Sequence, residues 1–100
     1  MTKRTAAAIR KEEILEAALA IATVSGLPAV SGKKIAIKMG VSRQAVMYHI
    51  TDMAALRRSV MQAAVDRKVL SVIAQGLASG CPIARAAPDE LRQRAADGLV

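Results

Sequence analysis

One stretch decides the fold, Ile35-Ala36-Ile37-Lys38-Met39-Gly40-Val41-Ser42-Arg43-Gln44-Ala45-Val46-Met47-Tyr48-His49-Ile50. Gly40 stands where a first short helix must end in a left-handed conformation, which a residue without a Cβ adopts at the lowest cost. Val41 is the apolar residue that the turn can bury, and Ser42 can cap the next helix by accepting a backbone N–H. The stretch therefore predicts two short helices joined by a tight turn, a helix-turn-helix, whose second helix commonly enters a DNA major groove.

The residues before this stretch predict further helix. Apolar side chains recur at three- and four-residue spacing from about Thr5 to Ser25, chiefly Ile14, Ala17, Ala18, Ile21 and Val24. Gly26 and Pro28 end that first helix, and Ser31 is placed to cap a second helix over about 32–39. The third helix should run from about Arg43 to Ile50.

After a predicted cap at Asp52, one long fourth helix is expected from Met53 to about Ala78. Ser79-Gly80-Cys81-Pro82 reads as a turn, and Pro88–Ala96 as a short last helix. No segment alternates as a strand would, so the predicted class is all-α. Residues 1–52 would form the helix-turn-helix part with a basic N-terminal arm, and residues 53–100 a helical dimerisation region of the same compact domain.

The charge distribution points to a polyanionic partner. The net charge is +7, and no acidic residue occurs between Glu16 and Asp52. That interval holds Lys33, Lys34, Lys38 and Arg43, while the N-terminal arm adds Lys3, Arg4, Arg10 and Lys11. A basic surface concentrated on one motif is typical of nucleic-acid binding.

Several other classes of protein are disfavoured. One histidine, one cysteine and scattered carboxylates supply no catalytic triad, metal cluster or glycine-rich phosphate loop, so we expect no enzyme and no cofactor. The single Cys81 excludes an intramolecular disulfide and is expected to be inert. The charged start has no signal-peptide core and the longest uncharged runs are too short to span a membrane. We therefore expect a cytoplasmic protein with no membrane partner.

The order of these features resembles the N-terminal DNA-binding domain of the TetR family of bacterial transcriptional repressors. The resemblance covers about Ile9 to Val60 and rests on the spacing of Ile14-Leu15-Glu16-Ala17-Ala18, Gly26, Ile35-Ala36, Gly40-Val41-Ser42, His49-Ile50 and Leu56. It implies a TetR-like three-helix bundle followed by a long fourth helix, with double-stranded DNA as the partner.

The chain departs from the family pattern in side chains and in length. The family usually has tyrosine at the position of Met47, phenylalanine at that of Ile50 and a phosphate-contacting lysine at that of Met53. Family members also carry a further helical domain for a small-molecule inducer, which the forty residues after Val60 cannot enclose. We therefore expect a short repressor of the kind found on plasmids and other mobile elements, with no small-molecule inducer.

The motif allows candidate DNA contacts to be named. Arg43 can pair bidentately with guanine, Gln44 with adenine, and Ala45 can meet a thymine methyl. The resemblance implies that Lys33, at the head of the second helix, also reaches a base edge. Phosphate contacts, which should make the affinity salt-dependent, are predicted for Ser31, Lys34, Ser42, Met47, Tyr48, His49 and Thr51, with Lys3 and Arg4 as a flexible arm.

Structural alternatives exist for several of these candidates. Arg43 and Gln44 could form an ordinary solvated face, and Lys34 and Lys38 could be solvated charges. His49 could be a satisfied structural histidine, and Tyr48 could cover the edge of the core.

Two further expectations concern assembly and role. Major-groove reading by a short helix-turn-helix usually needs two copies, and the apolar stripe of Met61–Leu77 exceeds what three small helices can cover. We therefore expect a homodimer on an inverted repeat; the alternative is that the last helix folds back on a monomer. A partition or replication accessory protein using the same motif is the alternative to a repressor.

Overall fold

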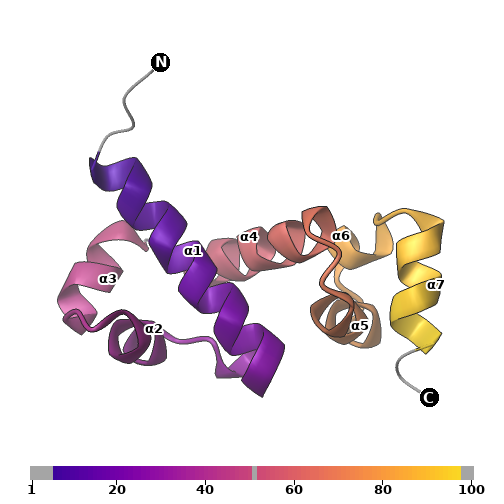
Figure 1. Ribbon diagram of the computed structural model, residues 1–100, viewed down its shortest axis with the longest axis horizontal. Coiled ribbons are helices and arrows are strands. Elements are labelled where there is room, and N and C mark those ends of the chain that lie inside the picture. The colour runs from indigo at the N-terminus through magenta and orange to yellow at the C-terminus, as the bar shows by residue number, and fades with distance from the viewer. Residues whose placement is uncertain (1–5, 51, 98–100) are drawn as a thin grey trace.

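The computed structural model describes residues 6–50 and 52–97, and over these residues the chain is helical with no strand (Figure 1). This confirms the all-α class. The elements are α1 (Ala6–Ser25), the 3-10 helix η1 (Leu27–Ala29), α2 (Gly32–Met39), α3 (Arg43–His49), α4 (Met53–Asp66), α5 (Leu70–Ser79), α6 (Pro82–Arg85) and α7 (Asp89–Asp97).

The predicted caps form in the N-terminal half. The Ser31 hydroxyl accepts the N–H of Lys34 at 3.2 Å, and the Ser42 hydroxyl accepts the N–H of Ala45 at 3.1 Å. Gly40 ends α2 in the left-handed region, with φ of 69°. The two short helices and the tight turn between them therefore form where the sequence predicts them.

The core under α2 and α3 is made from one face of each helix. Ile35 of α2 and Val46 of α3 are fully buried, together with Ile14 and Ala18 of α1. The alanine on α1 leaves room for the neighbouring helices to approach closely, and α1 packs against both of them. Burial of apolar surface of this kind stabilises a fold by about 25 cal/mol per Å².

The prediction of one long fourth helix is wrong. α4 ends at Asp66, and the chain turns at Arg67–Val69 before α5 begins. Lys68 adopts φ of 58°, its N–H binds the carbonyl of Val65, and the N–H of Val69 binds the carbonyl of Ala64. This hydrogen-bond pattern is a Schellman motif, which usually has glycine at its left-handed position. Because that position is Lys68 here, the sequence offers no glycine from which the end of α4 could be predicted.

The turn lets α5 pack back on α4, and α6 and α7 complete the C-terminal half (Figure 1). Gly76 of α5 makes this close approach possible, because a Cβ there would lie 2.6 Å from the Met61 methyl and from the Cβ of Ala84. The last helix is Asp89–Asp97, near its predicted range, whereas α6 (Pro82–Arg85), which begins at the last residue of the predicted turn, was not predicted.

The apolar stripe of Met61–Leu77, which was expected to remain exposed for dimerisation, is covered by other helices of the same chain. Met61, Ala64, Val72 and Ile73 are buried, and the flanking apolar residues are half-buried. The argument for a dimer from an uncovered stripe is therefore wrong, and the last helix folds back on α5. Val24 also departs from its predicted burial, since it is 85% exposed on a side of α1 that no other helix covers.

The molecule is about 39 Å long, with α2 and α3 at one end and α5–α7 at the other (Figure 1). α1 and α4 connect the two ends. Over the part of the chain that the structure describes, every helix is too short or too polar to cross a membrane.

Candidate nucleic-acid interface

The α3 helix turns one face to the core and the other to solvent. Val46 is fully buried, and Ile50, directly after the helix, is nearly so. Arg43 and Gln44 are exposed in the first turn, and Ala45 is half-buried beside them. The three predicted base-reading side chains of α3 thus lie together at its N-terminal end, where a groove-reading helix carries its base contacts, while the fourth, Lys33, lies in the first turn of α2.

Met47 packs partly against α2. It retains 37% exposure, and a Cβ on Gly32 would lie only 2.6 Å from its Sδ. Gly32 therefore allows the sulfur to lie directly over the first turn of α2. The thioether has no N–H or O–H to donate to a phosphate oxygen, and its sulfur instead packs against Gly32 between α3 and α2.

Tyr48 and His49 differ in exposure. Tyr48 is 82% exposed, which contradicts the alternative that it covers the edge of the core. His49 is half-buried, and its ring meets the Tyr48 ring edge to face with centroids 5.1 Å apart. The phenol is therefore free to reach outward from the C-terminal end of α3.

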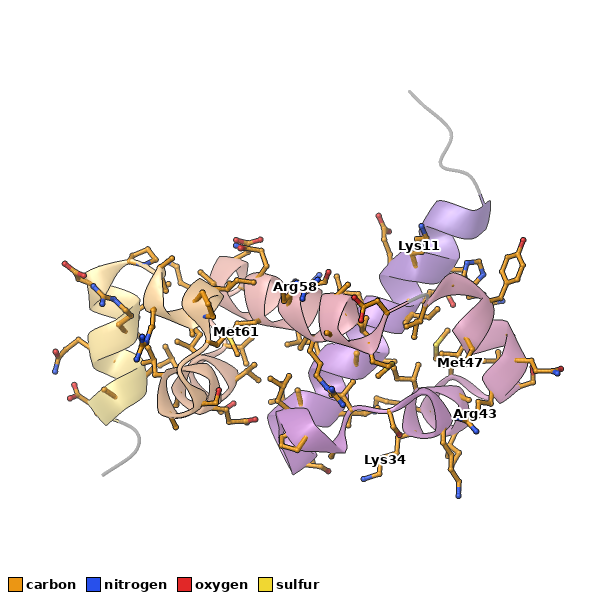
Figure 2. The ribbon with its side chains drawn as sticks, turned by 180° about the vertical axis from the view of Figure 1, so that it is seen from behind. Lys11, Lys34, Arg43, Met47, Arg58 and Met61 are labelled. Atoms are coloured by element: carbon orange, nitrogen blue, oxygen red, sulfur yellow. The ribbon has the colours of Figure 1, made fainter. Side chains whose placement is uncertain are left out.

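The α2 helix supplies a basic surface on one side of α3. Lys33, Lys34 and Lys38 are exposed, and Figure 2 shows Lys34 and Arg43 at the same end of the molecule. Ile37 is also 71% exposed between two of these lysines, which sequence analysis did not single out.

Both predicted serines use their hydroxyl oxygens as helix caps. Ser31 is half-buried and Ser42 exposed, so each hydroxyl hydrogen is still available to a phosphate oxygen. Lys3, Arg4 and Thr51 lie outside the described residues.

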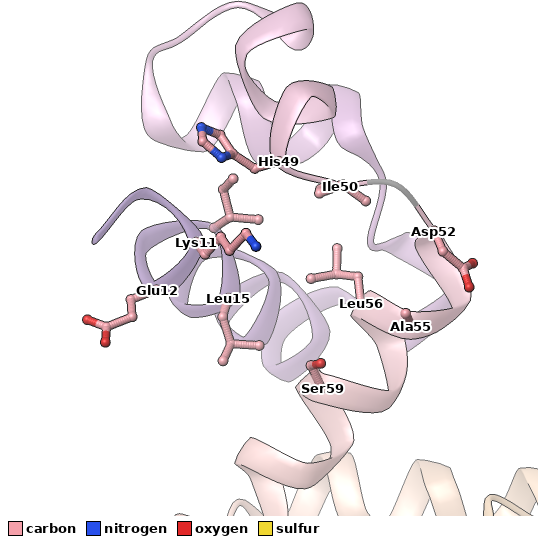
Figure 3. A pocket seen from close by; sticks show the side chains of 10 residues that line it. Lys11, Glu12, Leu15, His49, Ile50, Asp52, Ala55, Leu56 and Ser59 are labelled. Atoms are coloured by element: carbon pink, nitrogen blue, oxygen red, sulfur yellow. The ribbon is translucent and has the colours of Figure 1, made fainter. Parts of the chain in front are cut away.

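An open cleft lies on the other side of α3, between α1, the end of α3 and the start of α4 (Figure 3). Its volume is about 390 Å³. The apolar residues Ile14, Leu15, Ile50 and Leu56 line it, with Lys11 and His49 as the nearest basic side chains. Lys11 belonged to the basic arm in the sequence prediction, and nothing in its spacing marks it as a neighbour of His49.

Four cations on or beside α3 make no ion pair within residues 10–50 and 52–97, namely Lys33, Lys34, Lys38 and Arg43. Arg67, by contrast, pairs with Glu16, and the hydrogen bond from its guanidinium holds the pKa of that carboxyl below the ordinary value. The segment from α2 to α3 thus carries four cations and no acidic residue, which makes it a basic surface.

Other kinds of site find no support in the described part of the chain. No group of three or more histidine, cysteine or acidic side chains there could hold a metal ion. Cys81 is half-buried and without a disulfide partner. Comparisons with family models, with curated proteins and with solved structures find no match to this chain.

Proposed function

We propose that this protein is a sequence-specific DNA-binding repressor of transcription, which places α3 in the major groove of an inverted-repeat operator as a homodimer. The observation that carries the proposal is the short α3 helix itself. Its inner face is buried through Val46, and its outer face holds exposed, unpaired Arg43 and Gln44.

The chemistry of these side chains suits base reading. Arginine can donate two parallel hydrogen bonds to guanine, and glutamine can form a donor–acceptor pair with adenine. Each good bidentate contact is worth about 1–3 kcal/mol of discrimination against the wrong base. Ala45, which follows them in α3, would add a methyl contact, and Lys33 of α2 would add a further base contact.

The α2 surface supports the electrostatic part of the proposal. Lys34 and Lys38 would neutralise phosphates on the strand beside α2, with the Ser31 and Ser42 hydroxyls and Tyr48 as further phosphate contacts. Each neutralised phosphate releases counterions, so the affinity should fall steeply as salt rises.

The homodimer follows from the size of the motif, because a single seven-residue helix reads few base pairs. Two copies would read half-sites about 34 Å apart, or a multiple of that distance. Sedimentation of the protein with and without its selected duplex measures the stoichiometry. One protomer bound per complete site would refute the dimer and leave base reading by α3 intact.

Selection of bound sequences from a random duplex pool tests sequence-specific reading. The expected result is a palindromic consensus, and Arg43→Ala or Gln44→Ala should relax preference at particular base positions. Lys34→Ala serves as the matched comparison, because loss of a phosphate contact weakens binding to all sequences equally. Recovery of no consensus would favour the partition or packaging role over the repressor.

A further inference from the structure

The cleft beside α3 has one cation at its centre. The Lys11 side chain extends from α1 into the cleft, toward the space between His49 and Leu56 (Figure 3). The carboxylates of Glu12 and Asp52 also line the cleft but point away from it on opposite sides. An anion entering the cleft would therefore meet the ammonium group first.

The neighbouring charges leave Lys11 available. Asp52 is engaged at the rim, where its carboxylate accepts the N–H of Ala54 at 2.9 Å and lies 3.9 Å from the Arg58 guanidinium. Lys11 is exposed and makes no ion pair within the described part of the chain. Its near neighbour Arg10 differs, because that guanidinium lies 3.6 Å from Glu13.

The position of Lys11 relative to α3 is the second argument. Lys34 of α2 lies on one side of α3, and Lys11 lies on the other (Figure 2). A major groove about 12 Å wide is bordered by one phosphate strand on each side. A helix bound in this groove therefore has a phosphate strand on each side, and the α2 lysines can contact only one of the two strands.

We propose that Lys11 is a phosphate-binding residue, which contacts the DNA strand across the groove from α2. The inference rests on the proposed DNA binding and adds the second strand to it. The cleft receives a phosphodiester oxygen at the Lys11 ammonium, with the half-buried His49 ring and the Ser59 hydroxyl at its edge.

The test measures binding of Lys11→Gln to a fluorescent random-sequence duplex of about three helical turns, by anisotropy over a series of salt concentrations. Loss of one phosphate contact should weaken binding about five- to tenfold for each protomer bound near 0.1 M salt, since each contact contributes a slope of about 0.9 in log affinity against log salt. The salt slope should therefore fall by about 1 for each protomer bound, which is about 2 for the proposed homodimer, and Lys11→Arg should restore both values.

Lys68→Gln is the matched control, because it removes the same charge from an exposed site at the turn between α4 and α5. It should leave the slope unchanged. If Lys11→Gln changes binding no more than Lys68→Gln does, the Lys11 site is refuted while DNA binding stands. If the wild-type protein does not bind the duplex in a salt-dependent way, the proposed function itself fails. Thermal melts followed by circular dichroism separate either result from unfolding.

Discussion

The turns at Gly40 and Lys68 have the same backbone geometry and different residues. Each ends a helix in the left-handed region, with φ of 69° and 58°. In each, the next residue donates its N–H to a carbonyl five positions back: Val41 to Ala36 at 3.1 Å, and Val69 to Ala64 at 2.8 Å. The first turn positions α3 and the second returns α5 onto α4.

The difference lies in what maintains each conformation. At Gly40 the residue itself favours the left-handed region, and no heavy atom lies within 4 Å of where a Cβ would be. At Lys68 the residue disfavours that region, so the packing of Val69, Val72 and Ile73 must hold the turn. A turn can thus be fixed locally by its residue or at a distance by the helices it joins.

The largest effect is expected from placing a side chain on the glycine turn. Gly40→Ala should lower the free energy of unfolding by about 1–2 kcal/mol, because an L-residue in the left-handed region costs that much. No atom lies near the position of a Cβ at Gly40, so a steric clash adds nothing to this cost. Gly40→Asn should lose less stability than Gly40→Ala, since asparagine tolerates the left-handed region. Urea denaturation measures both values, and equal losses for Ala and Asn would contradict this account.

The reverse substitution at the lysine turn should give a smaller gain. Lys68→Gly removes the left-handed cost but adds flexibility to the unfolded chain, so a net stabilisation of about 0.5–1 kcal/mol is expected. Lys68→Ala keeps the cost and should change stability little. A destabilised Lys68→Gly variant in thermal melts would mean that the lysine side chain itself holds the turn.

The smallest effect is expected from the ion pair beside that turn. Arg67, next to Lys68, pairs with Glu16 of α1 and holds the pKa of Glu16 below its ordinary value of 4.5. The pair therefore contributes stability above about pH 4.5, which is lost as the pH falls through the lower folded pKa. Both groups are exposed, so the contribution is small and should shrink in high salt.

Denaturation of the wild type and Glu16→Gln from neutral pH to about pH 3 measures this contribution. The two stabilities should converge as the pH falls. Arg67→Gln should remove the same pH-dependent difference. A gap between wild type and Glu16→Gln that is constant over this range would show that the carboxylate charge plays no part.

The part of the fold that local chemistry determines could be predicted from sequence. Gly26, Ser31, Gly40, Ser42 and Asp52 each signal a helix boundary through their own side chain or its absence, and every one of these boundaries forms. The break after α4 carries no such signal, because lysine is an ordinary helix residue and only tertiary packing holds it at positive φ. That missed break also led to the wrong inference of an uncovered apolar stripe.

The same distinction applies to the candidate site. Arg43 and Gln44 could be placed on the outer face of α3 because the period of one helix determines which face is buried. The neighbourhood of Lys11 and His49 could not be predicted, since these residues are far apart in sequence and meet only through the crossing of α1 and α3. The contact of Met47 with Gly32 likewise requires two helices in their final positions.

The Gln75 side chain links the C-terminal half of the molecule to the end of α1. Its amide oxygen accepts the N–H of Leu27 at 2.6 Å, and its amide nitrogen donates to the carbonyl of Ala22 at 3.2 Å. A glutamine of α5 thus satisfies the backbone at the end of α1, across about half the chain. A fragment containing residues 1–52 alone would leave both backbone groups without this partner, so the two ends of the molecule should unfold in one cooperative transition.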